Sequence, residues 1–109
     1  MITIEDFEKV DIRVGKIIEA SLNEKARIPA YKLKIDFGED LGIKTSSAQL
    51  TELYEANELV GMQIIAVVNF PPRQVASVLS EVLVLGCNSK QGTVLLKPER
   101  SVEEGINIY

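Results

Sequence analysis

The sequence predicts an all-β domain, a small five-stranded barrel with short helices. Residues 31–37 alternate apolar and polar side chains, as a half-buried strand does. Residues 64–68 form an apolar and largely β-branched run, which is typical of a fully buried strand. Three predicted strands precede a predicted helix and two or three more follow it, an order that suits a closed antiparallel sheet.

Length and composition suit a single domain. The chain has 109 residues, enough for one modest core. Its only cysteine, Cys87, has no partner for an internal disulfide. Residues 1–6 lack the basic region of a signal peptide, and the longest apolar runs are too short to cross a bilayer. We therefore expect a cytoplasmic protein without membrane insertion.

The residue types argue against an enzyme. No histidine is present, which removes Ser-His-Asp and Cys-His nucleophile systems and most zinc and haem sites. The glycines are scattered singly and form neither a Walker A loop nor a dinucleotide fingerprint. Ser46 and Ser47 near Lys44 could imitate a Ser-Lys dyad, but polar residues at a strand end explain them more simply. We predict no catalytic residue, no metal site and no cofactor.

Charge is unevenly spread in a chain whose net charge is −4. A net negative charge disfavours sequence-independent DNA binding, because that affinity comes mainly from neutralising phosphates. Basic residues nevertheless gather in one part of the chain. They are Lys25, Arg27, Lys32, Lys34 and Lys44, with Arg73 further along. One face of the folded chain can therefore be basic.

The predicted N-terminal elements are a short helix and a bent strand. Thr3 can cap a helix over residues 3–10, and so short a helix needs its own barrel or a second subunit to pack against. Residues 11–20 predict the first strand, and Gly15, at a change of phase, predicts a bulge in it. A polar loop follows over residues 21–30.

The second and third strands form a predicted hairpin. Residues 31–37 make the second strand, residues 38–42 a turn, and residues 43–47 the returning strand. The side chains expected to face the core are Tyr31, Leu33, Ile35 and Phe37. Residues 48–57 predict a helix, because their apolar residues recur at helical spacing.

Two buried strands joined by an irregular connection are predicted in the centre of the chain. The strand over 64–68 stops at Asn69, and a Phe-Pro-Pro segment prevents the ladder from continuing. Arg73 follows on a rigid segment, so it is either a fixed binding residue or a surface arginine after a turn. The connection over residues 74–79 is unusually apolar, and a second buried strand is expected over residues 80–86.

The last predicted elements are a turn over residues 87–92, a strand over 93–97 and a closing edge strand over 105–109, in its own barrel or across a dimer. This order of elements is that of an OB-fold, a Greek-key barrel that binds ligands on its second and third strands. On that face we expect Lys32, Lys34, Lys44, Ser46 and Ser47, with a solvated sheet face as the alternative.

Several segments together resemble the tRNA-binding-domain family. They are Asp11–Ile17 (DIRVGKI), Ser46–Gln49 (SSAQ), and Asn69–Arg73 (NFPPR) followed by Ser80-Glu81. The resemblance runs nearly end to end, and within the family it is strongest to stand-alone CsaA-type export chaperones. The tRNA-binding relatives often carry a basic residue and a glycine after the Pro-Arg pair, where this chain has the apolar stretch Gln74–Leu79.

The resemblance implies one tRNA-binding-type OB-fold domain over residues 1–109. Its parts are an N-terminal helix over 1–10, a barrel over 11–97 and a C-terminal segment over 98–109. It also implies a homodimer, whose contacts we assign to Ile4, Phe7, Ile106 and Ile108. The implied function is non-enzymatic: a chaperone that holds unfolded or precursor polypeptides for the secretion machinery. A stand-alone, structure-specific tRNA-binding protein is the alternative.

One set of predicted residues is assigned to the ligand, whether RNA or polypeptide. The predicted RNA- or peptide-binding residues are Lys32, Lys34, Lys44, Ser46, Ser47, Gln49, Asn69, Phe70, Arg73, Val78, Ser80 and Glu81. For RNA, the basic side chains would contact phosphates, and shape rather than sequence would be recognised. For polypeptide, Phe70, Val78 and their apolar neighbours would form a wall, while Arg73 and Glu81 would orient the bound chain.

Overall fold

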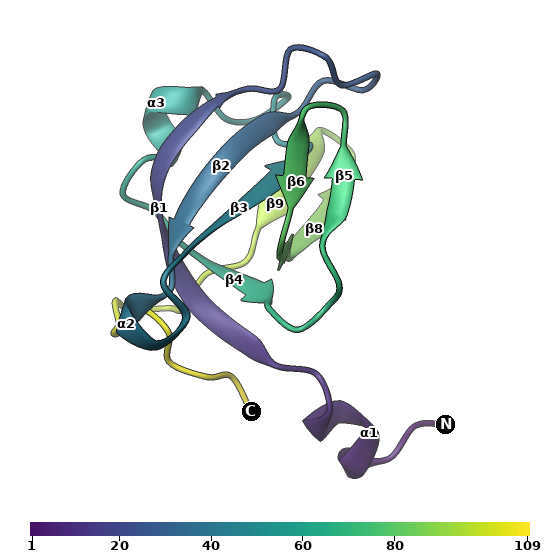
Figure 1. Cartoon of the computed structure of the whole chain (residues 1–109), viewed down its shortest axis with the longest axis vertical. Helices are drawn as coiled ribbons and strands as arrows, with labels where there is room; N and C mark the ends of the chain where they lie inside the picture. The colour runs from purple at the N-terminus through teal and green to yellow at the C-terminus, as the bar shows by residue number, and fades with distance from the viewer.

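Five antiparallel strands curl into a nearly closed barrel in the computed structural model, which describes residues 1–109 (Figure 1). The sheet order is β3-β2-β1-β4-β7, with β1 (Ile12–Leu22), β2 (Tyr31–Asp36), β3 (Ile43–Ala48), β4 (Gln63–Val67) and β7 (Leu83–Val84). Two hairpins flank it, β5 (Arg73–Val75) with β6 (Val78–Ser80), and β8 (Gly86–Ser89) with β9 (Gly92–Leu95). The helices are α1 (Ile4–Glu8), α2 (Gly38–Leu41) and α3 (Ala56–Leu59). The predicted all-β OB-fold class is confirmed.

The alternation along β2 builds the core as expected. Tyr31, Leu33, Ile35 and Phe37 are all buried, and they pack with the inner side chains of β1 and β4. The intervening side chains face outward on the opposite side of the sheet. Period-two patterning therefore fixes which face of this strand meets the barrel interior.

Gly15 serves the barrel in a different way from the predicted bulge. The register between β1 and β2 shifts between Ile17 and Glu19, so the irregularity lies further along the strand. A Cβ on Gly15 would lie 2.6 Å from Cγ2 of Ile35 and 2.6 Å from Cε1 of Phe37. Glycine is needed there because the barrel walls approach each other too closely for a side chain.

The predicted helix over residues 48–57 is wrong. The first of these residues ends β3, and α3 supplies only a short helical turn further along. Tyr54 donates its N–H to the Leu50 carbonyl at 3.2 Å, which makes a single turn. The Tyr54 carbonyl then accepts a hydrogen bond from the Tyr31 hydroxyl at 2.7 Å, instead of from the amide four residues later. Leu50 itself is buried in the barrel core, so tertiary packing overrides the helical spacing.

The region predicted as one buried strand over residues 80–86 is divided among the end of β6, β7 and the start of β8. The predicted irregular connection over residues 74–79 lies in the β5–β6 hairpin. Glu81 donates its N–H to the Thr45 carbonyl on β3 at 2.8 Å, whereas β7 pairs with β4. Strands β3 and β4 are not neighbours in the sheet. The chain must therefore change partner along this segment, and that change closes the barrel. The predicted turn over 87–92 is shorter than expected, because its first three residues belong to β8.

The two termini lie together at one end of the molecule. Helix α1 projects away from the barrel (Figure 1), with the predicted Thr3 cap in place and no buried residue. The C-terminal segment runs beside β1, where the Ile108 N–H donates to the Ile12 carbonyl at 2.8 Å and Arg13 forms a bridge with Asn107. No helix is long and apolar enough to span a membrane.

Candidate functional site

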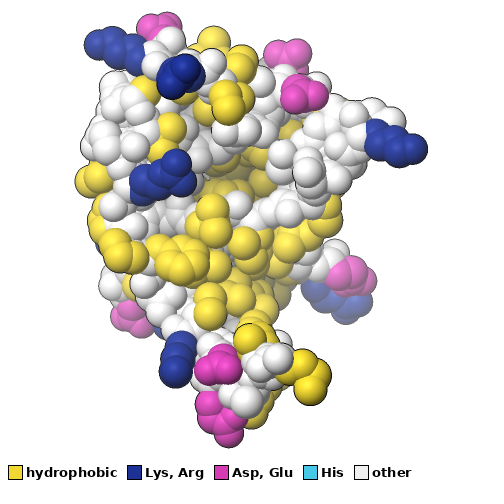
Figure 2. All heavy atoms as spheres, turned by 90° about the vertical axis from the view of Figure 1, so that its right-hand side faces the viewer, with side chains coloured by type: hydrophobic (Ala, Val, Ile, Leu, Met, Phe, Trp, Pro, Cys, Tyr) yellow, Lys and Arg dark blue, Asp and Glu magenta, His cyan; other side chains and the backbone are white.

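A groove of about 690 Å³ lies between the loop that follows β1, the end of β3, the β5–β6 hairpin and the segment from β7 to β8. Figure 2 shows apolar side chains around a hollow on this side of the molecule. Its lining consists of Lys25, Ala26, Arg27, Ile28, Ala30, Ser47, Ala48, Gln49, Leu50, Arg73, Val75, Ala76, Leu83, Val84, Leu85, Gly86, Cys87, Asn88, Thr93 and Leu95. No acidic and no aromatic residue is among them, so the groove offers aliphatic surface and positive charge.

Three basic side chains stand at the groove without ionic partners. Lys25, Arg27 and Arg73 are exposed, and none of them forms an ion pair. The chain as a whole carries a net charge of −4. The groove therefore concentrates positive charge on an otherwise acidic molecule, and it will attract negatively charged groups.

Asn23 holds the β5–β6 hairpin over the groove, and nothing in the sequence pattern indicates this role beyond its place in a polar loop. The side chain is buried, with 5% of the residue exposed. Its Nδ2 donates to Ser47 Oγ at 3.2 Å and to the Val75 carbonyl at 3.0 Å, and Ser77 Oγ donates to Asn23 Oδ1 at 3.4 Å. One amide thus joins the loop, the end of β3 and the hairpin.

Ser46 and Ser80, predicted to bind a ligand, use their hydroxyls inside the chain. Ser46 is 1% exposed and donates to the Val82 carbonyl at 3.0 Å. Ser80 Oγ lies 3.3 Å from Ser46 Oγ and accepts the Ser47 N–H at 3.1 Å. These groups fasten the free edge of β3 to the segment that follows β6.

Glu81 continues this fastening along the same edge. Its Oε1 accepts the Thr45 N–H at 3.0 Å and the Thr45 hydroxyl at 3.1 Å. The same hydroxyl lies 2.6 Å from the Leu79 carbonyl and can donate to only one of the two oxygens at a time. We call residues 45–47 and 79–82 the barrel seam. At this free edge of β3, the Glu81 carboxylate accepts hydrogen bonds as a neighbouring strand would. Its observed role is to close the barrel rather than to orient a ligand.

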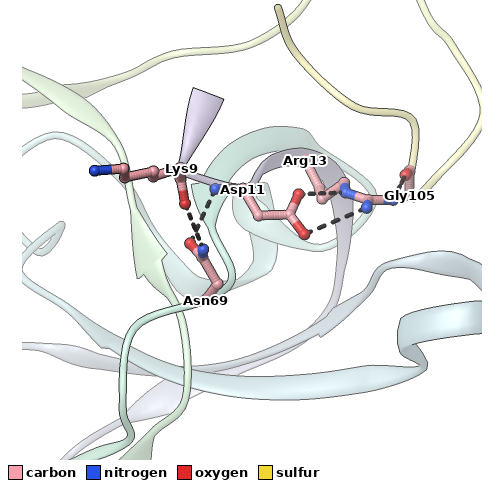
Figure 3. Close-up of polar contacts among 5 residues, drawn as sticks. All are labelled: Lys9, Asp11, Arg13, Asn69 and Gly105. Carbon is pink, nitrogen blue, oxygen red and sulfur yellow. Dashed lines mark hydrogen bonds and ion pairs between the residues drawn. The ribbon is translucent and has the colours of Figure 1, made fainter. Parts of the chain in front are cut away.

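Asn69 and the residues around Arg13 fasten the termini (Figure 3). The Asp11 N–H donates to Asn69 Oδ1 at 2.9 Å, and Asn69 Nδ2 donates to the Lys9 carbonyl at 2.8 Å. Arg13 Nε lies 2.6 Å from Asp11 Oδ1, and its Nη1 donates to the Gly105 carbonyl at 3.0 Å. The hydrogen bond to Asp11 raises the pKa of the Arg13 guanidinium, an effect that burial partly offsets.

The three lysines expected on one face do not share it. Lys32 and Lys34 lie on the outer face of β2, and Lys34 Nζ is 3.2 Å from Glu19 Oε2. Lys44 stands opposite Ile35, which is fully buried, and directly opposed residues share a face. The expectation fails because odd and even positions of β3 point to opposite sides of the sheet.

The groove gathers only part of the predicted set. It contains Ser47, Gln49 and Arg73. It leaves out Lys32, Lys34, Lys44, Ser46, Asn69, Phe70, Val78, Ser80 and Glu81. Val78 is buried, so it cannot belong to an exposed apolar wall, whereas Phe70 is 51% exposed but stands outside the groove. Among the other lining residues, Lys25 and Arg27 stand out in the sequence only as basic residues, and the segment over 83–88 carries no sequence signal for a site.

A second hollow, of about 650 Å³, separates helix α1 from the C-terminal segment. All its apolar lining residues come from the termini and the start of β1. Among the predicted dimer residues it contains Ile4, Phe7 and Ile108, and the neighbouring Ile106 is exposed. Ile4 is 65% exposed on a helix that packs against little else.

Comparison with known proteins assigns the chain to a family. Residues 12–107 match the family model described as "Putative tRNA binding domain". Among curated proteins, the chain is 34% identical over its whole length to the methionine–tRNA ligase of Methanococcoides burtonii, and 38% identical over 95% of its length to that of Leptospira biflexa. It spans only 16% and 15% of those two ligases.

Solved structures give similar proteins of the same size. The CsaA chaperone protein from Picrophilus torridus is 54% identical with a TM-score of 0.95, and each chain covers 100% of the other. The chaperone CsaA from Bacillus anthracis is 47% identical with a TM-score of 0.93, covering 100% of this chain and 99% of its own. This chain therefore belongs to the tRNA-binding-domain family, and its fold is that of the CsaA chaperones.

Proposed function

We propose that this protein is a homodimeric, non-enzymatic chaperone that holds unfolded or precursor polypeptides. The aliphatic groove, with a basic rim formed by Lys25, Arg27 and Arg73, is the observation that supports this function most. The similarity to CsaA chaperones over the whole chain supports it independently. From the resemblance to CsaA-type export chaperones we extend the proposal to a cytoplasmic location and to delivery of clients to the secretion machinery.

The size and lining of the groove suit polypeptide segments. A volume of about 690 Å³ is in the range of sites that enclose small ligands, so it can hold several side chains. Twelve of its 20 lining residues are hydrophobic, which favours apolar side chains that an unfolded protein exposes. A groove of this kind distinguishes unfolded from folded proteins, because folded proteins bury such side chains.

Dimer formation is proposed from the exposed and half-buried apolar residues at the termini. Helix α1 has five residues, and such a short helix gains its stability from packing rather than from its own hydrogen bonds. Ile4, Phe7, Ile106 and Ile108 would supply that packing across a twofold axis. Two copies of the groove in one dimer would strengthen the capture of a long client by avidity.

Removal of residues 1–10 tests the dimer. We expect monomers or poorly folded protein, since Asn69 would also lose its hydrogen bond to the Lys9 carbonyl. Light scattering gives the mass, and the double variant Ile4→Ser with Phe7→Ser keeps that hydrogen bond for comparison. A truncated protein that remains an intact dimer would show that the helix does not join the subunits.

A tRNA-binding protein is the second candidate. It is supported by the family match and by the methionine–tRNA ligase relatives. Lys32 on the outer face of β2 and the three basic residues of the groove could contact phosphates. The groove lacks aromatic side chains on which bases could stack, which makes this function the less favoured one.

The deciding experiment measures both ligands on the same protein. Fluorescence anisotropy follows labelled tRNA over a salt series, and then a labelled, reduced and carboxymethylated protein that cannot refold. We expect the unfolded protein to bind with a weaker salt dependence than tRNA shows, and tRNA to bind weakly. Tight tRNA binding that falls steeply with salt, together with no binding of the unfolded protein, would overturn the proposal.

A further inference from the structure

Strand β8 has an unpaired edge. It pairs with β9 on one side and has no strand on the other. Two pairs of the β8–β9 hairpin occupy hydrogen-bonded positions. One is Ser89–Gly92, which closes the two-residue loop, and the other is Leu85–Leu96, in which the Leu96 N–H donates to the Leu85 carbonyl at 3.3 Å. Because hydrogen-bonded and non-bonded pairs alternate along an antiparallel ladder, Gly86 and Asn88 occupy the non-bonded positions.

The backbone groups of Gly86 and Asn88 therefore point away from β9. In that register neither residue takes part in a ladder bond to β9, and no backbone hydrogen bond outside the strands involves them. The two residues are exposed. Together they present two donors and two acceptors at the spacing that an added strand needs.

The groove runs along this edge. Its lining includes every residue from Leu83 to Asn88. A groove that faced only one side of a strand would contact every second residue, so this groove follows the edge of the strand. An extended segment bound there would turn every second side chain toward the aliphatic lining. Its other side chains would point toward the opening of the groove.

Charge indicates which side chains the opening prefers. Lys25, Arg27 and Arg73 stand around it without ion-pair partners, and no carboxylate lines the groove. Acidic side chains would gain from all three cations, whereas basic side chains would be repelled.

We propose that the groove binds its client as an added β-strand along Gly86–Asn88 and prefers segments in which apolar and acidic residues alternate. The inference rests on the proposed polypeptide-binding function and specifies its substrate class. The absence of aromatic lining residues favours such a peptide over single-stranded RNA, whose phosphates would otherwise suit the same cations.

Labelled ten-residue peptides at submicromolar concentration test the preference. One alternates Leu and Glu, and its matched partner alternates Leu and Lys. We expect the Leu-Lys peptide to bind at least about tenfold more weakly, because three exposed cations each contribute a modest amount. Equal or tighter binding of the Leu-Lys peptide would overturn the proposed preference.

N-methylated forms of the Leu-Glu peptide test the strand geometry. One form carries methyl groups on the Leu amides and the other on the Glu amides, so each blocks one edge of the extended peptide. We expect only the form blocked on the edge facing β8 to lose binding, by about tenfold or more. Equal affinities of the two forms would overturn the added strand.

Asn88→Pro tests the same edge from the protein side. Proline is tolerated at positions of an edge strand that make no ladder bond, and it removes the outward N–H. We expect Asn88→Pro to bind the peptide more weakly than Asn88→Ala does, with matching melting curves. Unchanged binding by a folded Asn88→Pro protein would contradict the proposal.

The carboxymethylated protein, measured in the same assay, separates the two proposals. If it binds but the peptides show neither charge preference nor an edge effect, the inference fails and the proposed function stands. If neither it nor any peptide binds, the proposed function fails. Displacement of the Leu-Glu peptide by single-stranded RNA that binds more tightly would assign the groove to nucleic acid and overturn the inference.

Discussion

The barrel seam and the rim of the groove use polar residues in opposite ways. Along the seam, the side chains of Ser46, Ser80 and Glu81 form hydrogen bonds within the chain. At the rim, Arg27 and Arg73 are exposed and make no ion pair. The two regions nevertheless meet, because Ser47 belongs to the seam and also lines the groove.

Within the family motifs, most polar side chains stabilise the fold, and only Ser47, Gln49 and Arg73 line the groove. Ser-Ser and Ser-Glu, which carry part of the family resemblance, close the barrel. Asn69, in another motif, holds the connection between α1 and β1. A shared motif therefore predicts the fold better than it predicts the ligand, and relatives with different partners can keep the same seam.

Asn23→Ala should have the largest effect, since this side chain joins the seam to the hairpin beside the rim. Three hydrogen bonds are lost, at about 1 kcal/mol each, so we expect about 3 kcal/mol less stability in urea unfolding. Client binding should fall as well, because the hairpin loses its support. Asn57→Ala, at an exposed position, is the control, and a loss below about 1 kcal/mol would show that the hairpin is held by other contacts.

Ser46→Ala should damage the seam without affecting the groove. The Val82 carbonyl then keeps only the longer hydrogen bond from Ser80 Oγ, at 3.4 Å, and we expect a cost of about 1 kcal/mol with unchanged client affinity. Chemical denaturation and the anisotropy assay measure the two quantities, with exposed Ser101→Ala as control. Unchanged stability with weakened binding would identify Ser46 as a ligand-binding residue and abolish the distinction between the two regions.

Local patterns predicted the parts of the fold that depend on one strand. Alternation along β2 gave its core face, and the run of apolar residues gave β4, because strand periodicity reports burial directly. The helix over 48–57 failed although its apolar spacing was good. The Tyr31 hydroxyl donates a hydrogen bond to the Tyr54 carbonyl, which is therefore not used by a helix. No local sequence pattern contains that long-range contact.

The candidate site was predictable only in part for the same reason. Arg73 was singled out by its rigid, proline-preceded segment, and it lines the groove. Val78 was expected on an exposed wall, but the tight turn of the hairpin points it into the protein. The groove is assembled from loops and strand ends distant in sequence, so its lining depends on the closed barrel rather than on any one stretch.

Arg73→Ala should change the rim and leave the seam intact. The guanidinium is exposed, so stability should shift by less than about 0.5 kcal/mol. Binding of an acidic client should weaken by about fivefold, which corresponds to roughly 1 kcal/mol for a charge at a partly enclosed site. Lys97→Ala, an exposed basic residue outside the groove, is the matched control. Equal affinities of the two variants would remove Arg73 from the site.

Ala76→Gly should have the smallest effect, and it should be stabilising. Ala76 has a φ of +54° in the two-residue turn between β5 and β6, a conformation that costs a residue with a Cβ about 1 kcal/mol. Glycine relieves this strain but adds freedom to the unfolded chain, so we expect a net gain of about 0.5 kcal/mol in urea unfolding.

The neighbouring Ser77→Gly substitution provides the contrast, because Ser77 does not have a positive φ. It should lower stability by about 1–2 kcal/mol, since it adds unfolded-state freedom without relieving strain and removes a hydrogen bond to Asn23. If both glycine variants are destabilised equally, the turn is not strained at Ala76. A stabilised Ala76→Gly protein with unchanged client affinity would show that the hairpin can be tightened without altering the groove, as expected if the rim cations and the β8 edge determine binding.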